Sequence, residues 1–76
     1  MNSELNTSLS EALKRYRDAK SKDVQHSEEW FKKIEDGPAP NKGDVDLFLT
    51  TADKLRKQVE AAWEAYRREA KKHYAL

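Results

Sequence analysis

Few side chains in this sequence could support catalysis or metal binding, and they are widely spaced. The chain of 76 residues has two histidines and no cysteine. His73 follows Glu69 by one helical turn, a spacing that permits a metal pair, but two ligands leave a site incomplete and no H-E-x-x-H motif is present. His26 stands beside Glu28 and Glu29 without further context. We therefore expect no catalytic residue, no metal and no cofactor, and a protein that is not an enzyme.

The serines are better explained as helix caps than as nucleophiles. Ser8 precedes Glu11 by three residues, which is the spacing of a capping box at the start of a helix. Ser27 precedes two glutamates and has the sequence context of a second N-cap. No glycine-rich phosphate-binding loop accompanies either serine.

A cluster of cations near the end of the sequence could contact phosphate groups. It consists of Arg67, Arg68, Lys71 and Lys72. Such a stripe on a helix is typical of contacts to a nucleic-acid backbone. However, carboxylates interrupt the cluster, and helix ends favour lysine and arginine through the helix dipole alone. Nucleic-acid binding through these residues is therefore the alternative hypothesis.

Length and composition restrict the class of protein. Fifteen Lys and Arg oppose 14 Asp and Glu, so the net charge of +1 is not that of a dedicated nucleic-acid binder. The absence of cysteine excludes a disulfide scaffold. Only two glycines and two prolines, with 38% charged residues, favour an all-α protein. No apolar run approaches the ~18 residues that cross a bilayer and no signal peptide is evident, which predicts a cytoplasmic protein.

One cluster of helix-breaking residues divides the chain into two arms of similar length. The segment 37–43 contains both glycines and both prolines. We predict a single small helical domain over residues 1–76, with helices over residues 8–36 and 44–75 and with residues 1–7 disordered. Gly37 is the expected left-handed C-cap of the first helix and Asp44 the N-cap of the second. A short connection favours an antiparallel two-helix hairpin. The alternative is three helices, with a break near residues 22–27.

Apolar residues recur at steps of three and four along both arms, as in the seam along which the helices of a coiled coil meet. The second arm has the cleaner pattern, with Val45, Phe48, Ala52, Leu55, Val59, Ala62 and Tyr66. The first arm has a weaker stripe with a polar centre, formed by Leu9, Leu13, Tyr16, Lys20, Asp23, Ser27, Trp30 and Ile34. Folding at the loop brings Trp30 near Phe48, and Tyr16 near Trp63. We also expect ion pairs between Asp23 and Arg56 and between Lys20 and Glu60.

Charge is unevenly distributed along the predicted hairpin. Residues 23–53, at the loop end, carry eight acidic and three basic side chains, whereas the remaining residues carry six acidic and 12 basic ones. The two ends therefore differ in sign, at −5 and +6. Two such hairpins attract most strongly side by side in opposite directions.

A lone hairpin would leave large apolar residues outside its seam uncovered, and a chain of this length rarely gains enough stability from one core. We therefore predict a homodimer that completes a four-helix bundle, with no membrane and no small-molecule substrate as partner. The expected function is a non-enzymatic helical protein-protein interaction module, such as an adaptor, regulator or assembly subunit. The expected interface residues are Trp30, Phe31, Leu49, Trp63 and Tyr74.

Overall fold

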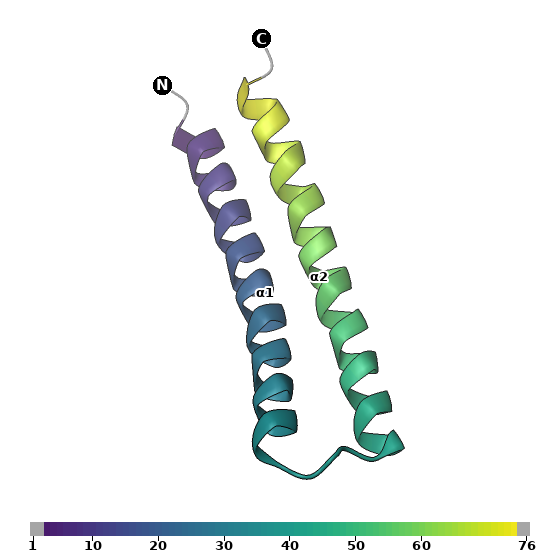
Figure 1. The fold of residues 1–76 in the computed structure, drawn as a ribbon. Coiled ribbons are helices and arrows are strands. Elements are labelled where there is room, and N and C mark those ends of the chain that lie inside the picture. Colours follow the sequence, from purple (N-terminus) through teal and green to yellow (C-terminus); the bar gives the residue numbers. More distant parts are fainter. Residues whose placement is uncertain (1–2, 75–76) are drawn as a thin grey trace.

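The chain forms two long antiparallel helices joined by a short loop in the computed structural model (Figure 1). The structure describes residues 3–74, with side chains described from residue 7 onward. Helix α1 spans Ser3–Asp36 and helix α2 spans Lys42–Tyr74, and no strand occurs within residues 3–74. The predicted helical hairpin is confirmed. Because α1 continues without a break through residues 22–27, the three-helix alternative is wrong.

Helix α1 begins earlier than the sequence indicated. Its first residue is Ser3, so Ser8 and Glu11 lie within the helix and do not cap its start. Residues 3–7, which we expected to be disordered, form the first turns of α1, and residues 1 and 2 lie outside the described residues. The physical reason is that neither glycine nor proline precedes Ser8, so nothing in the chain stops the helix from extending.

Proline ends α1 at the start of the loop. Pro38 has no N–H group with which to continue the helical hydrogen bonding, and its ring is incompatible with a further turn. The N–H of Gly37 donates to the carbonyl oxygen of Lys33 at 3.0 Å. No glycine within residues 3–74 has a positive φ, so the predicted left-handed C-cap at Gly37 is wrong. A Cβ atom at this position would lie 3.0 Å from the same oxygen, and this close approach favours glycine instead.

Asn41 caps the start of α2. Its Oδ1 accepts a hydrogen bond from the backbone N–H of Asp44 at 2.8 Å, and its own N–H lies 3.4 Å from Oδ2 of Asp44. This reciprocal pair satisfies two amides that the first turn leaves free. Asp44, which we expected as the N-cap, is the third residue of the helix. The helix ends at Tyr74, and residue 75 lies outside the described residues.

We expect Asn41→Ala to lower the free energy of unfolding by about 1 kcal/mol, because it removes this cap. Asn41→Ser should stay close to the wild type, since serine caps about as well as asparagine. Urea denaturation followed by circular dichroism measures both variants. Equal stability of the alanine and serine variants would contradict the role of the cap.

The two helices meet along a seam that repeats every seven residues. The α2 side of the seam is the predicted one, and all its members are partly buried. On α1 the seam consists of Leu9, Ala12, Tyr16, Ala19, Asp23, His26 and Trp30. Ala12, Ala19 and His26 thus take the places that we had assigned to Leu13, Lys20 and Ser27. Leu13 and Ser27 lie partly covered beside the seam, whereas Lys20 and Ile34 are exposed.

Almost no side chain is fully enclosed. Among residues 7–74 only Ala12 is buried, with 6% of its surface exposed. The molecule measures 57 × 18 × 14 Å with a radius of gyration of 17.2 Å, whereas a compact chain of this length has about 11 Å. In a single layer of two helices each seam residue is covered from one side only, so the hairpin encloses almost no core of its own.

The expected ion pairs between the helices are not formed. The described ion pairs join Arg67 to Glu64 at 3.2 Å and Lys72 to Glu69 at 3.4 Å, both within α2. Lys20 Nζ lies 3.4 Å from the hydroxyl of Tyr16, one turn away on α1. No ion pair therefore crosses the seam in the part that the structure describes.

Candidate protein-interaction surface

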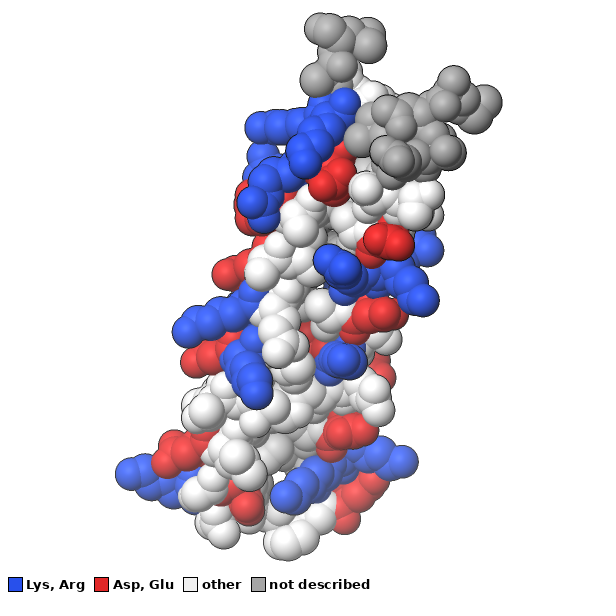
Figure 2. All heavy atoms as spheres, turned by 180° about the vertical axis from the view of Figure 1, so that it is seen from behind, with Lys and Arg blue, Asp and Glu red and all other residues white. Residues whose placement is uncertain are grey.

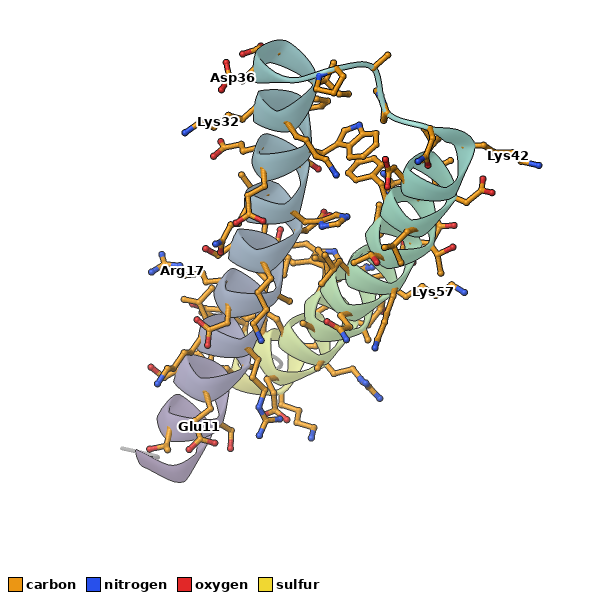
Figure 3. All side chains as sticks on the ribbon, turned by 90° about the horizontal axis from the view of Figure 1, so that it is seen from below. Glu11, Arg17, Lys32, Asp36, Lys42 and Lys57 are labelled. Carbon is orange, nitrogen blue, oxygen red and sulfur yellow. The ribbon has the colours of Figure 1, made fainter. Side chains whose placement is uncertain are left out.

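Three aromatic rings stack between the helices at the loop end. Phe48 of α2 lies between two rings of α1, with its centroid 4.5 Å from that of Trp30 and 4.8 Å from that of His26. The Nε2 atom of His26 is 3.2 Å from the carbonyl oxygen of Phe48, within hydrogen-bond distance of the tautomer that carries its proton there. Figure 3 shows aromatic rings in the space between α1 and α2 near the loop. Trp30, predicted as an interface residue, is thus largely engaged within the hairpin.

A second aromatic group lies nearer the open end, where α1 begins and α2 ends. The rings of Tyr16 and Trp63 are 5.1 Å apart, and those of Trp63 and Tyr66 are 5.7 Å apart. This contact confirms the expected proximity of Tyr16 and Trp63. Trp63 nevertheless keeps 42% of its surface exposed, so a large part of the side chain is accessible to a further contact.

Large apolar side chains follow one side of the seam, and we call them the apolar flank: Val24, Phe31, Ile34, Leu49 and Trp63. Each of Ile34, Leu49 and Trp63 follows a seam residue by four positions, which places them on the same side of the seam in an antiparallel pair. Val24 and Phe31 are seven residues apart, and Phe31 precedes Ile34 by three. All five are exposed, Phe31 by 57% and Leu49 by 52%. Phe31, Leu49 and Trp63 were predicted interface residues.

Two exposed apolar residues lie away from this flank. Tyr74, also predicted as an interface residue, lies at the last turn of α2 and makes an edge contact with the ring of His73. Leu47 borders a groove of about 290 Å³ on the opposite side of the seam, together with His26, Trp30 and Phe48. Neither residue continues the apolar flank.

The opposite side of the seam is charged toward the open end. A second groove of about 290 Å³ there is lined by Ser8, Glu11, Ala12, Arg15, Ala65, Arg68, Glu69 and Lys72. In Figure 2 charged side chains line both long edges of the back of the molecule, and an uncharged strip runs between them. The structure brings Arg68 and Lys72, two predicted phosphate contacts, together with Arg15. Sequence reasoning missed Arg15, although the antiparallel pairing of the helices could have placed it opposite Ala65.

The four cations predicted to contact phosphate do not form one free surface. Arg67 and Lys72 are paired with Glu64 and Glu69. The spacing of the four along α2 spreads them over the outer side of the helix, with only part of the cluster in the groove. Neighbouring carboxylates therefore offset much of the positive field that a nucleic-acid backbone would require.

Two further features bear on the type of site. No group of three or more His, Cys, Asp or Glu residues that could hold a metal ion occurs among the described residues. Within residues 3–74, neither helix combines the length and apolar character needed to cross a membrane. Comparison with known proteins found no matching family model, no matching curated protein and no matching solved structure.

Proposed function

We propose that this protein is a non-enzymatic helical interaction module that binds another protein chain through the apolar flank. The observation that carries this proposal is the contrast between a hairpin with one buried residue, among those described, and five large apolar side chains exposed along one side of it. Aromatic and aliphatic side chains of this kind form the desolvated centre of protein interfaces.

The supporting geometry distinguishes this flank from scattered surface apolar residues, which are common on monomers. The seven-residue spacing places its members in lines along the rod, and Phe31 and Leu49 lie on facing helices near the same end. An elongated line of apolar side chains fits a partner helix or helix pair, which would pack along the same direction.

Photocrosslinking tests the proposal with a matched pair of positions. A benzophenone amino acid replaces Phe31 in the flank, or the neighbouring exposed Lys32, which lies about 100° further around α1. We expect protein crosslinks from position 31 and few from position 32, and a loss of the former when Leu49→Ser is added. Equal crosslinking from both positions, or none from either, would overturn the proposal.

The competing hypothesis is a nucleic-acid regulator that uses the basic open end. Titration with duplex DNA and structured RNA decides between the two hypotheses. Binding that weakens steeply with salt, and that disappears when the four cations of α2 are replaced by alanine, would favour the regulator over the interaction module.

A further inference from the structure

We infer that the chain covering the apolar flank is a second copy of this protein, packed antiparallel to the first so that two hairpins form a four-helix bundle. This inference rests on the proposed function and names the partner that it requires. It is carried by two independent observations: the amount of surface that the hairpin exposes, and the arrangement of charge along the flank.

The exposed area of the hairpin exceeds that of a compact protein of the same mass. The chain exposes 6289 Å² for a mass of 8.9 kDa, whereas a compact monomer of that mass exposes about 4,800 Å². Stable interfaces of standard size remove about 800 Å² from each partner. A second hairpin that removed this much would lower the exposed area to about 5,500 Å² per chain, which is nearer to the compact value.

The two halves of the same flank differ in net charge, although Glu60 continues the line of Asp46 and Asp53 into the cationic half. Arg17 precedes Val24 by seven residues and thus extends the line of Val24 and Phe31 toward the open end. Arg56 lies midway between Leu49 and Trp63. On the loop side, the exposed carboxylates at the edge of the flank on α2 are Asp46 and Asp53. None of these charged residues takes part in an ion pair among the described residues.

The antiparallel arrangement satisfies the charges and the apolar residues together. Turning the second copy end over end places the Asp46 and Asp53 half of one flank against the Arg17 and Arg56 half of the other. With Val24 close to the two-fold axis, the same turn places Leu49 of one copy near Trp63 of the other on α2, and Phe31 of one copy over Arg17 of the other on α1. A parallel pair would oppose like charges at both ends, which electrostatic complementarity disfavours.

Reciprocal charge reversal tests this arrangement by sedimentation equilibrium. One variant carries Asp46→Lys and Asp53→Lys, and the other carries Arg17→Glu and Arg56→Glu. We expect the wild type to dimerise and each variant alone to self-associate at least about tenfold more weakly, because the attraction between the oppositely charged halves is lost twice across the two-fold axis. An equimolar mixture should form a heterodimer close to wild-type affinity, since each reversed half then meets its complement.

A matched control separates this arrangement from a general effect of net charge. Glu28→Lys with Glu35→Lys changes the charge of the same half by the same amount, on the outer side of α1. We expect it to weaken dimerisation less than about threefold. Circular dichroism at equal concentration checks that all variants remain helical.

The outcomes separate this inference from the proposed function. A wild type that is monomeric at every accessible concentration would overturn the homodimer, while crosslinking from position 31 to a different protein would leave the interaction module standing. A dimer that is insensitive to both reversals, equally sensitive to the control, or not restored in the mixture would overturn the antiparallel arrangement. Absence of crosslinks from position 31 would overturn the interaction module itself.

Discussion

Phe48→Ala is expected to lower the free energy of unfolding by about 2–3 kcal/mol, one of the two largest stability changes that we predict for this chain. Removal of a fully buried phenylalanine costs about 3–5 kcal/mol, and Phe48 is only partly buried. Its ring stacks on Trp30 and His26, so its loss leaves two aromatic side chains without their partner. Urea denaturation followed by circular dichroism, with tryptophan fluorescence as a second probe, measures the change.

Phe31→Ala is the matched control, because it removes the same side chain from the same end of the molecule. Phe31 is 57% exposed and lies outside the seam, so we expect its removal to change the stability of the single hairpin by less than about 0.5 kcal/mol. Association with a second copy makes the free energy of unfolding rise with protein concentration, and Phe31→Ala should reduce only this rise. Phe31→Ala could instead lower the free energy of unfolding of the dilute protein as much as Phe48→Ala does. In that case the assignment of Phe48 to the hairpin and of Phe31 to a partner would be wrong.

The pairing of the helices could be predicted because two features of the sequence determine it. The glycine and proline cluster places the fold-back point within a few residues, and the seven-residue repeat of α2 leaves one side of that helix to face α1. Together they correctly predicted the contacts of Trp30 with Phe48 and of Tyr16 with Trp63. Large aromatic residues provide the strongest signal in such a pattern, since few alternative positions can accommodate them.

The seam of α1 could not be assigned residue by residue, because its true members are weakly apolar. A search for large apolar residues selects Leu13, whereas the strict repeat that keeps Tyr16 and Trp30 in the seam selects Ala12. In the same way, the strict repeat places Ala19 in the seam, whereas the search for a stripe had placed Lys20 there. A difference of one residue rotates the face of a helix by about 100°, which also explains why Ile34 lies on the exposed flank and not in the seam.

Helix ends and the interaction surface depend on geometry that local patterns leave open. Both Asn41 and Asp44 are good N-cap residues, and only the course of the loop decides that Asn41 caps and Asp44 closes the reciprocal pair. The exposure of Phe31, Leu49 and Trp63 follows the sequence prediction. Trp30 makes the predicted contact with Phe48, and this contact engages much of its ring within the hairpin.

Asp23→Leu is expected to raise the free energy of unfolding of the hairpin by about 1–2 kcal/mol, which is the second of the two largest effects. Asp23 is partly buried in the seam, and by the pairing of Trp30 with Phe48 it lies opposite Leu55, seven residues further along α2. It forms no ion pair among the described residues. Leucine would remove the cost of covering an unpaired carboxylate and add apolar contact with Leu55.

Asp18→Leu serves as the control, because Asp18 is exposed on the same helix and its replacement should change stability by less than about 0.5 kcal/mol. Denaturant unfolding at a low protein concentration measures both variants without the contribution of a dimer. A buried polar residue in a helical seam often specifies alignment at a cost in stability. Destabilisation of the dilute protein by Asp23→Leu would therefore contradict this prediction, because it would mean that the carboxylate has a compensating partner within the single hairpin. Destabilisation that appears only at high protein concentration would instead indicate that a cation of a second chain contacts the carboxylate.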